Sequence, residues 1–338
     1  MSRTSYLQIF TPARTAARNA QVSNEQFKPA ARPVGLFFGG TSGIGQAMAE
    51  QLAHQTNGRA HIILLGRNQE AANKIIASFP QTPAGTPPNE ESKYSFIKVD
   101  ATSMAQVRDV TAKLSNDLEK INFIVATAGY STLKGRDESP EGIDRKIACT
   151  FYARFRFIHD LAPLVEKTAE KQETTGIMSV FAPGRGSQVD LDDLGLVKGY
   201  SIKRAHDEIV TYNDAAFEVS TFYPPSVKAI STSLFFQEFA SRYPNLSFVH
   251  AFPGLVTTPA VTNNTGSMFL VPLIRPFSVT PEQCAQVMWW RLWNPQGEWK
   301  TGAHQLSHHG EELEHNRFVT PEVRKAVWEH AVHMTGPK

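Results

Sequence analysis

The chain has 338 residues, of which 41% are hydrophobic and 20% are charged, a composition typical of a folded globular protein. Its formal net charge is only +2, which gives no reason to expect nucleic acid or an anionic membrane as a partner. Cys149 and Cys284 show no pairing pattern, which favours a reduced, intracellular setting. No apolar run approaches the roughly 18 residues needed to cross a bilayer, so no stable membrane insertion is expected.

The first 33 residues differ in composition from the rest of the chain. They contain several arginines, serines, threonines and alanines, and no acidic residue precedes Glu25. Such a composition is typical of a mitochondrial transit peptide, and mitochondrial import is therefore one interpretation. We prefer the simpler one, in which residues 1–33 are a flexible leader, with a short helix packed outside the sheet, on a cytoplasmic protein.

Residues 34–45 predict an apolar strand that ends in a glycine-rich turn and continues as a helix. The glycines have the spacing G-x-x-x-G-x-G, and the turn leaving the strand needs the positive φ that glycine adopts without strain. Glycine also lets backbone N–H groups approach a phosphate, and the last glycine lets the helix pack closely on the sheet. With a strand before it and a helix after it, the motif predicts a binding site for the diphosphate of a dinucleotide.

Strands and helices alternate through most of the chain. Further apolar runs predict strands at 60–65, 94–99, 121–126, 176–181 and 246–251. Helical spacing predicts helices at 69–78, 103–119 and 141–170, the last of them kinked by Pro163. This alternation predicts an α/β fold with a doubly wound parallel sheet, the Rossmann fold, in a single domain over residues 34–338.

Five motifs in the expected order make the chain resemble the short-chain dehydrogenase/reductase family from Val34 to about Met334. They are the glycine turn, the acidic Asp100, the segment 126–129 (Ala-Thr-Ala-Gly), the strand at 176–181 and the segment 253–258 (Pro-Gly-Leu-Val-Thr-Thr). The stretches 143–146, 191–196 and 247–254 are similar to a fungal branch of the family found in secondary-metabolite pathways. The resemblance implies an oxidoreductase that uses a nicotinamide cofactor.

The resemblance also implies which residues contact that cofactor. Asp100 would bind the adenine amino group, the alternative being the N-cap of the next helix. Gly129 would let the chain pass under the adenosine ribose, and the segment 253–258 would contact the nicotinamide. The full set is Gly39, Thr41, Ser42, Gly43, Ile44, Gly45, Arg67, Asn68, Asp100, Ala128, Gly129, Pro253, Gly254, Val256 and Thr258.

The residue after the second strand favours NADP(H) over NAD(H). An acidic side chain at this position would bind a free ribose 2′-hydroxyl and repel a 2′-phosphate. Arg67 stands there instead, and a guanidinium forms charge-assisted, bidentate bonds with phosphate. The alternative is that Arg67 is a solvated surface charge.

The substrate half departs from the family's pattern of a Tyr and a Lys one helical turn apart, a Ser after the fifth strand and an Asn on the long helix. The pair 181–182 (Phe-Ala) stands where the serine is expected, and Thr150 and Thr127 replace asparagines. Ser179 should point to the opposite face of its strand, and Ser187 lies in the following loop. The serine that would polarise a substrate carbonyl is therefore missing from its expected position, and Ser187 is left as a residue whose loop could swing into the site.

Two tyrosine–lysine pairs approximate the expected spacing. Tyr200 has Lys203 three residues on, and Tyr223 has Lys228 five residues on, although two prolines prevent an ordinary helix within the second pair. A neighbouring ammonium lowers the pKa of a tyrosine from near 10 toward the range useful for proton transfer. The segment 204–226 resembles an insertion, and the alternative is that neither tyrosine is catalytic.

We expect an NADPH-dependent ketoreductase or alcohol dehydrogenase, because the cofactor half is intact. The alternative is a redox-inactive isomerase, dehydratase or binding scaffold, because the serine and the Tyr–Lys spacing are missing. The apolar segment 267–277 falls where the family keeps its substrate loop and suits a lipophilic small molecule. The histidines between 304 and 315 have no accompanying carboxylates or cysteines at ligand spacing, so no metal site is predicted, and the sequence leaves homo-oligomerisation open.

Overall fold

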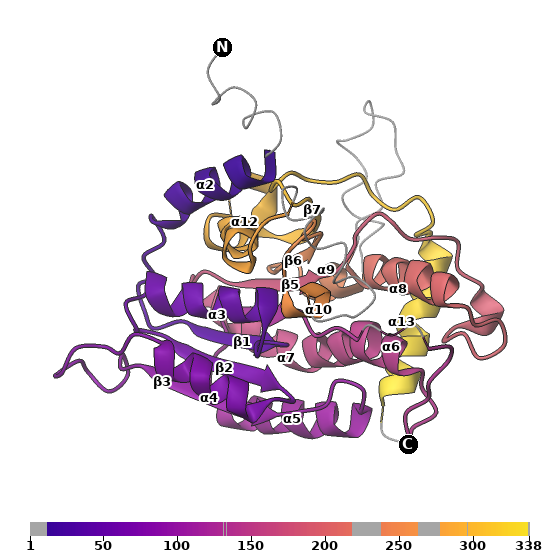
Figure 1. The fold of residues 1–338 in the computed structure, drawn as a ribbon, viewed down its shortest axis with the longest axis horizontal. Coiled ribbons are helices and arrows are strands. Elements are labelled where there is room, and N and C mark those ends of the chain that lie inside the picture. Colours follow the sequence, from indigo (N-terminus) through magenta and orange to yellow (C-terminus); the bar gives the residue numbers. More distant parts are fainter. Residues whose placement is uncertain are drawn as a thin grey trace, which may run out of the picture.

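The computed structural model describes residues 12–130, 132, 134–217, 238–262, 278–295 and 297–336. Seven parallel strands form one sheet in the order β3-β2-β1-β4-β5-β6-β7 (Figure 1). The strands are β1 (Val34–Phe38), β2 (His61–Gly66), β3 (Lys93–Lys98), β4 (Phe123–Ala126), β5 (Gly176–Val180), β6 (Ser247–Ala251) and β7 (Gly302–Leu306). The predicted doubly wound parallel sheet in a single domain is confirmed, and β7 is a strand that the apolar runs did not indicate.

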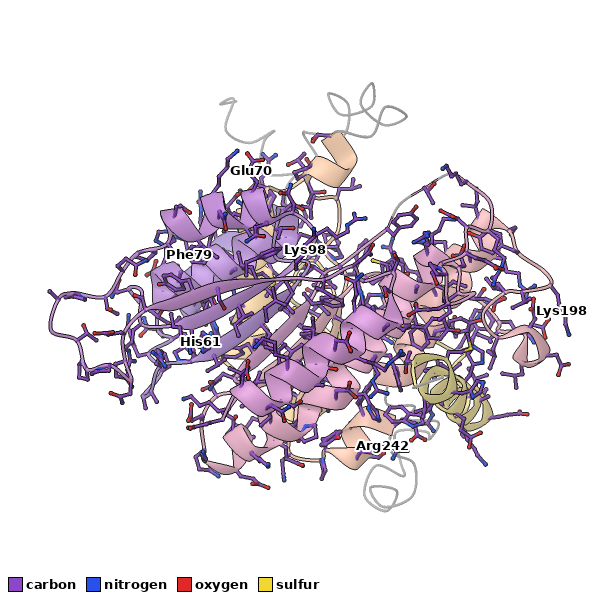
Figure 2. The ribbon with its side chains drawn as sticks, turned by 90° about the horizontal axis from the view of Figure 1, so that it is seen from below. His61, Glu70, Phe79, Lys98, Lys198 and Arg242 are labelled. Carbon is purple, nitrogen blue, oxygen red and sulfur yellow. The ribbon has the colours of Figure 1, made fainter. Side chains whose placement is uncertain are left out.

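Helices cover both faces of the sheet. One layer consists of α2 (Pro12–Asn24), α3 (Gly43–Gln55), α4 (Gln69–Ser78) and α12 (Pro281–Trp293). The other consists of α5 (Met104–Asp117), α6 (Arg145–Ile147), α7 (Ala153–Glu170), α8 (Ile202–Phe217), α9 (Glu238–Arg242) and α13 (Pro321–Thr335). Phe79, at the end of α4, and Lys198, in the loop before α8, lie at opposite ends of the molecule (Figure 2). No helix within these described ranges is long and apolar enough to cross a bilayer.

The central strands are buried on both faces, which explains why their sequences are continuous apolar runs rather than alternating ones. Side chains along β1 still alternate: Leu36 and Phe38 enter the core beneath α5 and α7, whereas Phe37 enters the core beneath α3 and α12. The chain order reverses at β1, which pairs with β2 on one side and β4 on the other. In such sheets a ligand crevice opens at the carboxyl ends of the two strands where the order reverses.

The long helix expected at 141–170 is divided. Asp144 caps its start by accepting bonds from the backbone N–H groups of Lys146 and Ile147. A π-helical turn, η1 (Ala148–Tyr152), then separates α6 from α7, and α7 continues through Pro163. The sequence predicted a kink at Pro163 but did not indicate this π-turn. Such turns occur frequently at functional sites.

The leader is only partly described, and its described part is packed. In α2, Ala17 and Ala20 are buried, and the Asn24 side-chain amide donates to the backbone oxygen of Gln286 on α12 at 2.8 Å. Beyond the helix, Phe27 stacks on Trp293 with ring centroids 4.7 Å apart. The described part of the leader thus contains a helix, Pro12–Asn24, packed outside the sheet as expected, and small alanine side chains let α2 approach α12 closely. Residues 1–11 lie outside the described part.

The segment expected to be an insertion, 204–226, begins inside the fold. Its residues 204–217 form most of α8, and Ala205, Ile209 and Tyr212 are buried in the core beside α13 and β6. Residues 204–217 are therefore a packed element of the domain, and the insertion stays a prediction. Residues 218–226 lie outside the described part, as does the expected substrate loop at 267–277.

Candidate functional site

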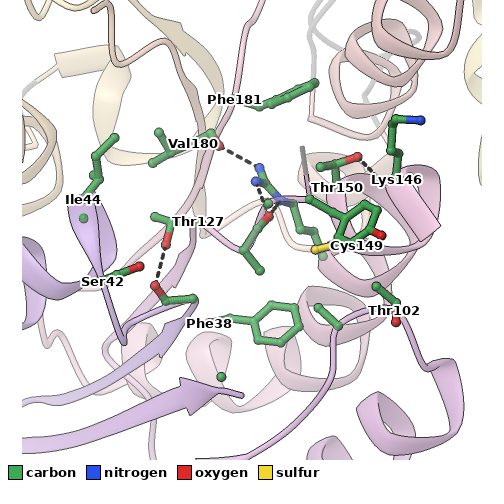
Figure 3. A pocket seen from close by; sticks show the side chains of 18 of the residues that line it. Phe38, Ser42, Ile44, Thr102, Thr127, Lys146, Cys149, Thr150, Val180 and Phe181 are labelled. Carbon is green, nitrogen blue, oxygen red and sulfur yellow. Dashed lines mark hydrogen bonds between the residues drawn. The ribbon is translucent and has the colours of Figure 1, made fainter. Parts of the chain in front are cut away.

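A cavity of about 670 Å³ opens at the carboxyl ends of the strands around β1, β4 and β5 (Figure 3). The glycine-rich turn, Arg67 and Asp100 line one part of it. Side chains from α6, η1, α7 and α8 line the other part, together with the residues that follow β5. The predicted cofactor half and the predicted substrate half are therefore brought together around one continuous space.

The glycine turn has the backbone that its spacing predicts. Gly39 has φ +100° and Gly43 has φ +58°, and a Cβ on Gly39 would lie 2.5 Å from the backbone nitrogen of Ala128. A Cβ on Gly45 would lie 2.6 Å from the Gly39 oxygen and would also collide with the Thr127 hydroxyl. A side chain at Gly39 would therefore collide with the chain that follows β4, and one at Gly45 would push α3 away from the sheet, so only glycine fits at either position.

The first turn of α3 presents free backbone donors to the cavity. Its N-cap residue, Ser42, lines the cavity and makes no capping bond through its side chain. The first N–H groups of a helix have no partner within the helix, and the helix dipole favours an anion there. Thr41, Ser42, Gly43 and Ile44 line this part, so the residues present fit a diphosphate.

Asp100 and Arg67 lie at the adenosine end expected from the resemblance. One carboxylate oxygen of Asp100 accepts bonds from the backbone N–H and the hydroxyl of Thr102, both at 2.9 Å. The N-cap of α5 is Ser103, so Asp100 does not cap that helix directly. Arg67 is exposed and lines the same cavity, where its guanidinium is available to a ligand.

Four predicted cofactor contacts support the site without lining it. Asn68 caps α4 by accepting the Ala71 N–H at 3.0 Å, and Gly45 lies in the helix–strand contact. Gly254 has φ +70° and packs against His308, and Val256 is buried in the core. A motif in the sequence includes residues that the local backbone or packing requires as well as residues that contact a ligand. The spacing alone does not distinguish the two kinds.

The loop that follows β6 lies beside the glycine turn and contributes two of the predicted residues to the cavity. Pro253 and Thr258 line the cavity, as do Ala128 and Gly129 after β4. A Cβ on Gly43 would lie 3.2 Å from the Thr258 methyl group, which shows how near this loop comes to the glycine turn.

An aromatic ring stands where a serine hydroxyl was expected. Phe181 follows β5 directly and lines the cavity, as Val180 does before it (Figure 3). Ser179 is buried and does not line the cavity, and its hydroxyl accepts a bond from Arg154 at 2.9 Å. Ser187 also lies outside the lining, so neither serine supplies a hydroxyl to the cavity.

Arg154, on α7, is a buried cation in the cavity wall that sequence reasoning missed. Its guanidinium donates to the Ala128 oxygen at 2.7 Å and the Val180 oxygen at 2.8 Å, and so joins the ends of β4 and β5. Its Cζ lies 5.6 Å from the centroid of the Phe181 ring. Burial lowers the pKa of Arg154 to about 10, so the side chain stays charged at neutral pH. No carboxylate lies within ion-pair distance of it in the part of the chain that the structure describes.

The lysine beside Tyr200 comes from a different element than the spacing suggested. Lys146, on α6, donates to the Tyr200 hydroxyl at 2.5 Å and to the Lys134 backbone oxygen at 3.0 Å. Lys203 instead has an 88% exposed side chain that pairs with Asp207 one turn further along α8. Tyr200 precedes the first residue of α8, so it does not share a helical face with Lys203, whereas Lys146 reaches it across the fold. Tyr223 and Lys228 lie outside the described residues.

The remaining hydroxyl and thiol groups of this half are occupied or inert. The Thr127 hydroxyl donates to the Gly39 oxygen at 3.2 Å, and the Thr150 hydroxyl donates to the Lys146 oxygen. Burial raises the pKa of the Cys149 thiol to about 11, so this thiol is neutral at physiological pH. The two threonines that replace asparagines therefore donate to backbone oxygens instead of presenting a polar group to a ligand.

One face of α8 completes the lining with Ile202, His206 and Ile209. The i, i+4, i+7 spacing of these residues is the signal in the sequence that could have identified them. The His206 ring meets the Phe181 ring edge-on, with centroids 5.7 Å apart. An imidazole therefore lies against the residue that replaces the expected serine.

Comparison with known proteins agrees with this geometry. Residues 34–180 match the family model described as short chain dehydrogenase. The chain is 30% identical to an oxidoreductase of Emericella nidulans over 78% of this chain and 72% of that protein. It is 28% identical to the short-chain dehydrogenase/reductase SAT2 of Stachybotrys chartarum over 75% of this chain and 71% of that protein.

Solved structures show the same fold at low sequence identity. An uncharacterised protein from Mycobacterium paratuberculosis has a TM-score of 0.62 at 14% identity, covering 92% of this chain and 96% of that chain. The L-sorbose reductase from Gluconobacter frateurii, solved with NADPH and L-sorbose, has a TM-score of 0.53 at 15% identity, covering 86% of this chain and 98% of that chain.

Proposed function

Because this chain belongs to the short-chain dehydrogenase/reductase family and is an oxidoreductase of that family, we propose that it uses NADP(H) to interconvert a carbonyl and an alcohol on a lipophilic small molecule. When bound, the nicotinamide would supply or accept a hydride. The observation that carries the proposal is the single cavity that joins the glycine turn and Arg67 to an apolar substrate half.

The cofactor-binding roles follow from the charges and donors in the cavity. The glycine turn and the first turn of α3 offer backbone N–H groups to the diphosphate. Asp100 offers a carboxylate oxygen to the adenine amino group, and Arg67 offers a guanidinium to a ribose 2′-phosphate. The choice of NADP(H) over NAD(H) rests on Arg67, because no carboxylate follows β2 at this position.

The lipophilic character of the substrate follows from the walls of the other half. Val180, Phe181, Ile202 and Ile209 present apolar side chains there, and the neutral thiol of Cys149 lies beside them. A cationic substrate would lose hydration in this half without gaining an opposite charge, and the cations of the lining, Lys146 and Arg154, already donate to oxygens of the protein. We therefore expect an uncharged, largely apolar carbonyl compound or alcohol.

The cofactor proposal is tested by substituting Arg67→Ala and measuring the Kd for NADPH and for NADH by fluorescence. A charge-assisted bond to phosphate is worth about 1.5–3 kcal/mol, so NADPH should bind on the order of tenfold to a hundredfold more weakly. Binding of NADH should change little, because it lacks the 2′-phosphate.

The matched control is Lys74→Ala, which removes an exposed cation of α4 that pairs with Glu70. This variant should bind both cofactors as the wild type does. If the Arg67→Ala variant keeps the wild-type ratio of the two dissociation constants, Arg67 does not select the cofactor and the NADP(H) proposal fails.

A further inference from the structure

We propose that His206 is the catalytic acid–base of the substrate half, giving the proton to the carbonyl oxygen during reduction and taking it back during oxidation. This inference rests on the proposed function and adds the proton donor that the missing Ser and Tyr–Lys spacing leave unassigned. It is carried by the position of His206 and by the state of the other titratable groups around the cavity.

The fold holds His206 at the substrate end. Ile202, His206 and Ile209 face the cavity from α8, which the buried side chains of Ala205 and Tyr212 anchor in the core. The His206 ring contacts Phe181, which Figure 3 shows on the wall after β5, across from the turn at the start of α3. The imidazole thus lies in the half of the cavity where the substrate's reacting group would sit.

The cationic groups in this half are committed to other partners. Lys146 donates to the Tyr200 hydroxyl and to the Lys134 backbone oxygen. Arg154 donates to the oxygens of Ala128 and Val180, and a guanidinium does not release its proton near neutral pH. Neither side chain is therefore suited to passing a proton back and forth.

The neutral groups are equally unsuitable. Burial raises the pKa of the Cys149 thiol, and the hydroxyls of Thr127 and Thr150 donate to backbone oxygens. Tyr130, which lines the cavity from the loop after β4, donates to Asp137 at 3.3 Å, and burial together with this carboxylate raises its pKa. Among the described residues that line the substrate half, His206 is therefore left as a side chain of the type that commonly acts as general acid and base.

The proton transfer balances the reduction. With NADPH bound, its hydride would form a C–H bond at the carbonyl carbon and leave NADP⁺, while the electron pair of the C=O π bond would move to oxygen. The imidazolium of His206 gives its proton to that oxygen, which forms the O–H bond of the alcohol and leaves the imidazole neutral. Water returns a proton to the ring for the next turnover.

The experiment compares His206→Gln with the wild type, using 9,10-phenanthrenequinone as an uncharged, apolar carbonyl probe. The NADPH Kd of the variant should stay within about twofold of the wild type. The kcat for the probe at pH 7 should fall by about 10² to 10⁴, the usual contribution of general acid–base catalysis. The pH dependence of kcat should show an ionisation in the wild type that is absent from the variant.

A second readout does not depend on turnover. It uses wild-type protein with ¹³C-labelled histidine, mixed with NADP⁺ and the quinone, which cannot react with each other because both are oxidised. The imidazole resonance that His206→Gln removes should shift when the quinone is added to the NADP⁺ complex. If this resonance does not move, His206 does not touch the substrate and the inference is overturned.

Two further variants test whether the effect is specific to His206. His54→Gln changes an exposed histidine on α3, outside the cavity lining, and should keep the wild-type kcat and pH profile. A loss of kcat in Tyr200→Phe without one in His206→Gln would assign the proton to the tyrosine and overturn the inference. A wild-type protein that binds no NADPH overturns the proposed function itself, whereas unchanged turnover in His206→Gln overturns this inference alone.

Discussion

Arg154 shows how a single side chain fixes the geometry between two strands. One of its acceptors is the hydroxyl of Ser179 on β5. Strand alternation predicts that this side chain points away from the cavity. The planar guanidinium donates in several directions at once, and so reaches Ser179, Val180 and Ala128 together. The wall of the cavity between β4 and β5 therefore depends on a residue that has no counterpart in the motifs of the sequence.

Replacing Arg154 by Met should destabilise the protein by several kcal/mol. Methionine fills similar space but leaves the oxygens of Ala128 and Val180 without their donor, and each buried unpaired acceptor costs about 1–3 kcal/mol. Arg154→Lys keeps the charge with fewer donors and should give an intermediate loss. Urea denaturation measures both, and a Met variant as stable as the wild type would show that removing the buried charge offsets the lost bonds.

At the scale of elements, α2 and α12 pack against each other in one helix layer. The tryptophans of α12 belong to the core: Trp289 and Trp293 are buried, and their rings are stacked with centroids 4.5 Å apart. Phe27 extends this stack, and the Trp289 indole N–H donates to the Met48 oxygen on α3. The segment before β1 therefore supports α3, the helix whose first turn faces the cavity.

Phe27→Ala should lower the free energy of unfolding by about 3–5 kcal/mol, the usual cost of removing a buried aromatic side chain. The matched control on the same segment is Val22→Ala. Val22 is 62% exposed, and its substitution should change the stability by no more than about 0.5 kcal/mol. Urea midpoints of the two variants measure the difference. Equal, small effects would mean that residues 12–33 pack too weakly to belong to the cooperative fold.

At the scale of the whole molecule, two histidines link stability to pH: His61, which is buried, and His330, which is half-buried. Burial, with Lys93 and Arg32 adding to it, lowers the pKa of His61 to about 4. Burial, with His333 adding to it, lowers the pKa of His330 to about 4. In the unfolded chain both side chains have the ordinary pKa of about 6.5, so the unfolded state binds more protons between these values.

The free energy of unfolding should therefore fall as the pH decreases from about 6.5 to about 4, and should be insensitive to these groups above pH 7. Urea midpoints between pH 7.5 and 4.5 test this, and His330→Gln should reduce the slope because it removes one of the two groups. A midpoint that stays level or rises on acidification through this window would contradict the burial of the neutral rings.

Much of the fold and the cofactor half could be predicted because their determinants are local. The apolar runs placed the ends of β2 to β6 within two residues, the largest difference being the start of β4, at Phe123 instead of Ile121. The substrate half was harder to predict from the sequence, because its lining comes from α6, η1, α7 and α8, whose side chains meet only after the helices pack. Lys146 and Tyr200, for example, are 54 residues apart in the chain.

The sequence by itself determined the parallel sheet, the glycine turn and the position of Arg67, since each depends on neighbouring residues: alternation of apolar runs, the need for positive φ, and the residue type that ends a strand. Only the tertiary structure decided that Lys146 rather than Lys203 lies beside Tyr200, that Arg154 joins β4 to β5, and that His206 faces Phe181. These contacts join elements distant in the chain, and the direction of each side chain depends on how helices pack against the sheet.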